Sequence, residues 1–284
     1  MSNKHFTNDE IDNIFSKINL PSEEEINRRC LERYKNSLNN PNQFTYWFPI
    51  VKNVLDSNLL QVKYPKTKTI PLSQDAFDVL LKEDEQAIIN HAELNALAKW
   101  AEDSMREFNS DHAFIKNSLF SAKHSWIDSC YITKSSDIKK NICNILYYWA
   151  MASHEYPTSM VVREFINATP VFHAFNKMPI TQEFRLFSKD GDTHSYQAYW
   201  PQHAIQNADC DNWKEKLKSI SEPSEELLAL MIQAANQITK EIGGDWSVDF
   251  LIDESGIPWL IDMALTSQSY ISDDLVKLEK KQLN

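Results

Sequence analysis

Two apolar runs near the end of the chain, joined by a short polar segment, each carry one acidic residue. The runs are 247–252 and 257–263, and residues 253–256 lie between them. Apolar runs separated by a short polar segment that contains glycine predict a β-hairpin. Because side chains alternate between the two faces of a strand, this pairing places Asp249 diagonally from Asp262 on one face.

Two carboxylates on one face of a sheet repel each other unless a cation lies between them. A hard cation such as Mg²⁺ takes carboxylate and phosphate oxygens as ligands, so Asp249 and Asp262 are a candidate metal pair. The alternative is an edge hairpin with a solvated acidic face. The apolar neighbours of both aspartates on either face argue against that alternative without excluding it.

The shortage of glycine limits the kinds of nucleotide site that the chain can build. The 284 residues suffice for one large domain or two smaller ones, but they include four glycines. Gly-rich dinucleotide fingerprints and P-loops need several glycines for close approach of the backbone to phosphate. A nucleotide site in this chain would therefore rely on side chains and on the edge of a strand.

Charge, cysteine and hydropathy patterns exclude several other classes. The net charge of −11 and the lack of a basic cluster argue against binding to nucleic acid. The four cysteines form no CxxC pair, and the histidines form no HExxH motif. The first residues lack the apolar core of a signal peptide, and the longest apolar run, 145–152, is too short to cross a bilayer. We expect a cytoplasmic protein without a membrane partner.

Helical and strand patterns follow one another along the chain. Capping boxes at 7–10 and 22–25 predict two helices, and apolar positions from Leu94 to Phe108 predict a third with one buried stripe. The later part predicts strands at 113–116, 127–132, 160–166, 181–187 and 195–200, and helices over 138–149 and 227–242. We therefore expect an α+β chain with a mostly helical lobe at 1–111, carrying an aromatic segment that faces a partner, and a mixed region at 112–284.

Charged residues inside the predicted strands are the second functional signal. Lys116, Arg163 and Arg185 interrupt apolar strands, and Lys123 lies in the loop after the first of these. Lysine point charges, an arginine fork and a metal are the groups that a triphosphate requires. Each residue also has a plainer interpretation: the lysines as surface groups, Arg163 as a structural partner of Glu183, and Arg185 as part of a solvated face.

The order of these segments resembles the ATP-grasp fold and, more narrowly, the cell division cycle 123 family, whose eukaryotic members assemble translation initiation factor two. The similar segments are YWFPIVKN, PKTKTIPLSQDAFDVLLKED, AFIKNSLFSAKHSWI, VVREFI, QEFRLF and SVDFLIDESGIPWLIDM. The resemblance runs from about Phe44 to about Met263, and EFRLF and WLID are its most specific parts.

The resemblance implies ATP and Mg²⁺ as cofactors, held between two lobes with mainly antiparallel sheets. It assigns nucleotide contacts to six residues, namely the phosphate-binding Lys116, Lys123 and Arg185 and an adenine-binding backbone at Arg163, Glu164 and Phe165. It assigns the metal to Asp249 and Asp262. It also implies a protein partner, which in eukaryotic relatives is the gamma subunit of initiation factor two.

Two positions depart from the family pattern. Ala264 stands where the family has a metal-binding asparagine, so Thr266, Ser267 or Gln268 would have to supply an oxygen, or one metal site is weakened. His124 stands in the lysine loop where the family usually has aspartate.

Three functions remain open from the sequence. The first is an ATP-dependent assembly or chaperone-like factor that acts on a protein. The second is a ligase that forms an acyl-phosphate and passes it to an amine, as most ATP-grasp proteins do; this rests on fold-level analogy. The third is a degenerate scaffold that binds no nucleotide.

Overall fold

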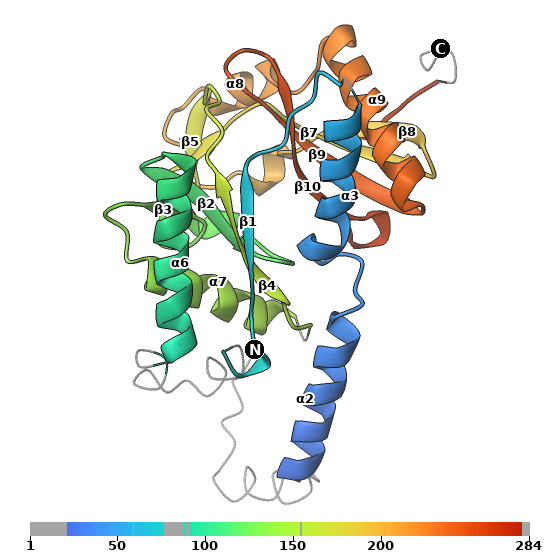
Figure 1. Ribbon diagram of the computed structural model, residues 1–284. Helices are drawn as coiled ribbons and strands as arrows, with labels where there is room; N and C mark the ends of the chain where they lie inside the picture. The colour runs from blue at the N-terminus through green and yellow to red at the C-terminus, as the bar shows by residue number, and fades with distance from the viewer. Residues whose placement is uncertain (1–21, 59, 77–87, 89–90, 154, 280–284) are drawn as a thin grey trace, which may run out of the picture.

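Antiparallel pairing builds two separate sheets, each backed by helices, and the sheets face each other through their other sides (Figure 1). The computed structural model describes residues 22–58, 60–76, 88, 91–153 and 155–279. The described helices are α2 (Glu23–Ser37), α3 (Phe44–Ser57), α6 (Ala92–Phe108), α7 (Ile138–Ala152), α8 (Trp213–Ser219) and α9 (Glu225–Ile242), with 3₁₀ turns η1 (Lys123–Asp128), η2 (Gln202–Ala204) and η3 (Thr266–Gln268). The α+β architecture with antiparallel sheets is the one predicted from the sequence.

The first sheet has the strand order β1-β4-β2-β3 and is covered on one face by α6 and α7. Its strands are β1 (Thr67–Pro71), β2 (His112–Asn117), β3 (Tyr131–Thr133) and β4 (Ser159–Glu164). Ala113, Ile115, Met160 and Val162 pack against the two helices in one core. Since side chains alternate, the intervening residues of β2 and β4 point to the opposite, inner face.

The second sheet has the strand order β10-β9-β7-β8-β11 and is covered on one face by α3 and α9. Its strands are β7 (Glu183–Lys189), β8 (Asp192–Ala198), β9 (Asp245–Ile252), β10 (Pro258–Leu265) and β11 (Val276–Lys277). Phe184, Leu186, Val248 and Phe250 lie in the core under these helices. The alternate residues of β7 and β9 therefore form the inner face of this sheet.

The chain crosses between the two lobes at an early extended segment. Lys63 donates its N–H to the carbonyl of Pro258 at 3.0 Å and accepts from the N–H of Leu260 at 2.8 Å, so this segment runs along β10 before the chain continues into β1 of the other sheet. Residues on both sides of the predicted boundary at 111/112 thus enter both lobes. The boundary stays a prediction about domain organisation.

Local signals account for several helix ends. The Ser22 side chain accepts the N–H of Glu25 at 3.2 Å and begins α2, as its capping box predicts. Gly243 ends α9 with φ of 70°, a conformation that favours glycine. The predicted helix with its capping box at 7–10 lies outside the described residues. The predicted strand at 127–132 is shorter than expected, because its first residues belong to η1.

A further pair of short strands lies beside the cavity between the sheets. A small hairpin joins β5 (Phe172–Ala174) to β6 (Met178–Ile180), and it packs with Trp126 and Trp200 in a third core. Among the described helices, none combines the length and the apolarity that a membrane crossing requires.

Candidate functional site

The inner faces of the two sheets bring the sequence-predicted charged residues together. On the first sheet, Phe114 pairs with Arg163 and Lys116 pairs with Val161, which places Lys116 and Arg163 on one face. On the second sheet, Arg185 pairs directly with Asp249. The pairing therefore gathers charges from segments far apart in the sequence at a single interface.

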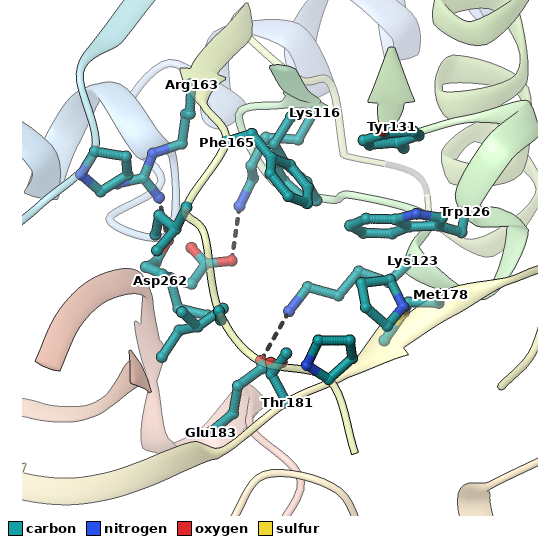
Figure 2. A pocket seen from close by; sticks show the side chains of 18 of the residues that line it. Lys116, Lys123, Trp126, Tyr131, Arg163, Phe165, Met178, Thr181, Glu183 and Asp262 are labelled. Carbon is teal, nitrogen blue, oxygen red and sulfur yellow. Dashed lines mark hydrogen bonds and ion pairs between the residues drawn. The ribbon is translucent and has the colours of Figure 1, made fainter. Parts of the chain in front are cut away.

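Two ion pairs cross this interface. The Nζ of Lys116 in β2 lies 2.7 Å from Oδ2 of Asp262 in β10. The Nζ of Lys123 in η1 lies 3.5 Å from Oε2 of Glu183 in β7. Figure 2 shows both lysines reaching from the first lobe toward acids of the second. Neither lysine is a freely solvated surface residue.

The two candidate metal ligands stand directly opposite each other. The register runs from Phe250 opposite Leu260 to Asp249 opposite Asp262, with a shift at Ile261. The predicted diagonal arrangement is wrong, because Asp262 lies two positions further along its partner strand. Ile252 pairs with Pro258 and not with Ile257, and the β-bulge at Ile261 adds the second residue. Asp249 is 5% exposed, so the solvated acidic face is also wrong for this residue.

Asp249 is held by the predicted phosphate ligand Arg185. The guanidinium donates from Nε to Oδ1 at 2.7 Å and from Nη2 to Oδ2 at 2.8 Å, which is a bidentate pair. The ring of Tyr199 lies 5.0 Å from the guanidinium carbon of Arg185 and 4.5 Å from Nζ of Lys123. One aromatic ring thus supports both cations.

The cations and acids shift each other's protonation equilibria. Burial raises the pKa of Asp262, but the charge and hydrogen bond of Lys116 outweigh burial and hold this pKa below its ordinary value of 3.8. Burial opposes the charge of Lys123, yet the acidic groups around it, Tyr199 and Glu183 first, raise its pKa. Burial likewise opposes the charge of Arg185, and Asp249 raises its pKa. Asp262, Lys123 and Arg185 therefore stay charged at neutral pH.

A cavity of about 360 Å³ opens between the lobes beside these ion pairs. Trp126 and Tyr131 line it with their rings stacked at 5.5 Å and 10°, and Phe165 meets Tyr131 edge-on at 5.4 Å. Figure 2 shows Trp126 and Tyr131 toward one side of the view and Asp262 toward the other, with Phe165 and Lys116 between them. The cavity therefore offers an aromatic wall for a flat ring and a charged wall for an anion.

The predicted adenine-binding segment leaves the first sheet at this cavity. Glu164 is the last residue of β4, and Phe165 begins the connection to the second lobe. The Glu164 carboxylate turns back to accept the N–H of Lys66 at 2.8 Å. The side chain of Arg163 points to the second sheet, where it contacts the carbonyls of Leu260 and Ile261. It does not form the pair with Glu183 that was the plainer interpretation.

Glu183 lies at the site, although it is not among the ligand-binding residues predicted from the sequence. It is buried and accepts from Nε1 of Trp200 at 3.1 Å and from Oγ1 of Thr181 at 3.2 Å, in addition to pairing with Lys123. A buried carboxylate is stabilised by donors of this kind. In the sequence, Glu183 lies two residues before Arg185 in a predicted strand. This spacing indicated that both side chains share one face, since residues i and i+2 of a strand do so.

The donor set around the two aspartates fits a hard divalent cation in part. Asp249 and Asp262 supply opposed carboxylates, while no group of three or more acidic, histidine or cysteine side chains lies close enough for a metal site within the described ranges. Phosphate oxygens and water would complete the shell. Arg185 and Lys116 now neutralise the two acids, so a metal would compete with both.

The structure locates oxygens around the position of the absent asparagine. Thr266 donates to Asp245 at 2.6 Å, and the side-chain oxygen of Gln268 accepts from Asn42 at 2.9 Å, so both are engaged elsewhere. Ala264 instead pairs with Ser247, whose buried hydroxyl lies two residues before Asp249 on the same strand. The Ser247 hydroxyl is engaged as well, with Oγ of Ser269 at 2.6 Å and the carbonyl of Ala264 at 3.3 Å.

Comparisons with known proteins find similarity to solved structures. No family model matches the chain, and no curated protein matches it. Similar solved structures include D-alanine–D-alanine ligase from Bacillus anthracis complexed with ATP (11% identity, 80% of this chain and 54% of that chain, TM-score 0.40) and the VanG D-Ala:D-Ser ligase from Enterococcus faecalis (13%, 82% and 56%, 0.43). A third is the ATP-grasp ligase PsnB complexed with a minimal precursor (6%, 82% and 55%, 0.40).

The chain spans little more than half the length of these three structures. Similarities at such TM-scores and identities establish neither the family nor an activity. The cell division cycle 123 resemblance, the ligands and the roles of the site residues therefore remain predictions.

Proposed function

We propose that this protein is an ATP-grasp protein of the cell division cycle 123 type that binds ATP with Mg²⁺ between its two sheets and acts on a protein partner. The observation that carries the nucleotide part is the cavity itself, which is lined both by aromatic rings and by Lys116, Lys123 and Asp262. A nucleotide needs a flat apolar surface for its base and cations for its phosphates.

Each charged residue has a role in this proposal. Lys116, Lys123 and Arg185 bind phosphate oxygens, and the backbone from Arg163 through Glu164 to Phe165 holds the adenine. Asp249 and Asp262 hold Mg²⁺, which when bound neutralises phosphate charge.

Binding of this kind requires the ion pairs of the site to exchange partners. Phosphate would take the place of Asp262 on Lys116 and of Asp249 on Arg185, and this frees both carboxylates for the cation. The number of charged contacts is thereby maintained, so the buried charges are not left uncompensated. The degenerate-scaffold alternative has less support, because Lys116, Lys123, Glu183 and Asp262 form ion pairs and line one cavity.

The proposal of a protein partner rests on the sequence resemblance alone. Among the aromatic residues expected to face a partner, Phe44, Trp47 and Phe48 are buried in the second core. Tyr46 is 48% exposed and is the side chain of this segment that a partner could reach. The proposed action is assembly or chaperone-like work on a protein such as the gamma subunit of initiation factor two.

Calorimetric titration of the purified protein with ATP, with and without Mg²⁺, tests the nucleotide part. Saturable binding that strengthens with Mg²⁺ is the expected result. Absence of binding at millimolar ATP would overturn it in favour of a scaffold. ADP release that depends on a small carboxylate and needs no protein partner would replace the assembly role with a ligase.

A further inference from the structure

Arg163 is a buried cation that joins three separate parts of the molecule. It is 3% exposed and belongs to β4 of the first sheet. Its guanidinium carbon lies 5.2 Å from the ring centre of Phe44 and 5.6 Å from that of Phe48, both in α3. Burial lowers the pKa of Arg163 to about 10, which leaves the group charged at neutral pH.

The N–H groups of Arg163 mostly point to the hairpin of the second sheet. Nη1 donates to the carbonyl of Ile261, and Nη2 lies 3.5 Å from the carbonyl of Leu260. The third contact, from Nε to Oγ1 of Thr67 at 3.2 Å, orients the guanidinium from its own sheet. The two carbonyls belong to the residues at the register shift of β10.

This register shift decides which way Asp262 points. Without the extra residue, Asp249 would face Ile261, and Asp262 would face Val248. Val248 is buried in the core under α9, on the face opposite Asp249. A shift of one residue exchanges the faces of a strand, so the bulge is what turns Asp262 toward the cavity. A bulge also leaves carbonyls out of the regular ladder, and Arg163 supplies donors to them.

We propose that Arg163 is a positioning residue that holds the β10 bulge and thereby presents Asp262 beside Asp249 as a pair of ligands for a divalent cation. This inference rests on the proposed function for the identity of the ligand. It differs from the role that the sequence resemblance assigned, because the side chain acts on the acidic hairpin rather than on the nucleotide.

Arg163→Lys and Arg163→Met separate this role from general support of the fold. Lysine keeps the charge but cannot reach two carbonyls with a planar fork, and methionine keeps much of the volume without the charge. Arg106→Lys is the matched control, since Arg106 is an exposed arginine at the end of α6. Thermal unfolding of each variant identifies any that fails to fold. If Arg163→Met does not fold, Arg163→Lys still tests the proposal.

The decisive measurement is the affinity for ATP with and without Mg²⁺ by calorimetry. In Arg163→Lys we expect the strengthening of ATP binding by Mg²⁺ to fall by about tenfold or more, as for other groups that orient metal ligands. An unchanged Mg²⁺ effect in a folded variant would overturn the proposal. Equal weakening with and without Mg²⁺ would also overturn it and would make Arg163 a nucleotide contact.

Hydrogen exchange of the β10 amides separates this inference from the proposed function. Loss of the two carbonyl contacts should speed exchange at 260–263 in Arg163→Lys, while β7 stays unchanged. If the wild-type protein binds no ATP, the proposed function fails, and the exchange result still decides whether Arg163 holds the bulge. Exchange at 260–263 that matches the wild type would show that it does not.

Discussion

The ammonium of Lys116 in β2 lies 2.7 Å from a carboxylate oxygen of Asp262 in β10, and this ion pair joins the two sheets across the cavity. The Lys116 side chain is 4% exposed, so its charge depends on a protein partner. A phosphate is the kind of anion that can replace Asp262 there without leaving the buried ammonium uncompensated.

Replacing Lys116 should therefore weaken nucleotide binding. We expect Lys116→Met to lower the affinity for ATP by about 10- to 100-fold, the usual effect of losing a hydrogen bond to a charged group. Calorimetric titration measures this change, and Lys99→Met provides a control at an exposed lysine of α6. Unchanged affinity in both Lys116→Met and Asp249→Ala would contradict the assignment of the site.

The bidentate pair between Arg185 and Asp249 predicts that Mg²⁺ and ATP assist each other. Free Mg²⁺ must compete with Arg185 for Asp249, whereas ATP offers Arg185 a phosphate in exchange. We expect each ligand to raise the affinity for the other by the same factor, about 5- to 150-fold, because binding free energies are reciprocal.

Titrations of Mg²⁺ at fixed ATP and of ATP at fixed Mg²⁺ measure this coupling. Arg185→Lys should reduce it, because lysine cannot form the bidentate pair. Mg²⁺ that binds as tightly without nucleotide as with it would show that the pair does not compete with the metal.

The aromatic side of the cavity should contribute to affinity for the base. Phe165 begins the connection between the lobes and lines the cavity. We expect Phe165→Ala to cost about 1–3 kcal/mol of ATP binding, the range measured for a base that stacks on an aromatic side chain. Tyr148→Ala in α7 is the control, since Tyr148 is exposed and lies outside the cavity lining. A loss of inorganic triphosphate binding as large as that of ATP would argue against a contact with the base.

Acid should weaken the contact between the lobes through Asp262. The folded-state pKa of this carboxyl lies below 3.8, so its stabilising effect is complete above that value and is lost as the pH falls through the folded pKa. Asp262→Asn should therefore have a lower free energy of unfolding than the wild type at neutral pH. This difference, the gap, should narrow in acid. Urea unfolding at a series of pH values measures the gap, with Asp273→Asn as an exposed control. A gap that stays constant in acid would contradict the depressed pKa.

Local patterns predicted much of the secondary structure and the charged positions within the strands. The stripe from Leu94 to Phe108 forms α6, and the stop at Gly243 ends α9, because helical periodicity and caps act within a few residues. The alternation of Glu183 and Arg185 against Phe184 likewise placed both charges on one face of β7. Patterns that span only a few residues can be recognised without knowledge of the rest of the fold.

By itself, the sequence determined that acids and cations interrupt strands in a fixed order and that the chain forms antiparallel hairpins. The tertiary structure alone decided that Asp262 stands opposite Asp249 and not diagonal to it. This arrangement depends on the pairing of Ile252 with Pro258 and on the bulge at Ile261, whose carbonyl accepts from Arg163 of the other sheet. The tertiary structure also decided which charges pair: Lys116 and Asp262 are 146 residues apart in the chain. The physical reason is that register and counter-charge depend on distant segments, whereas propensity and periodicity reach only one or two turns along the chain.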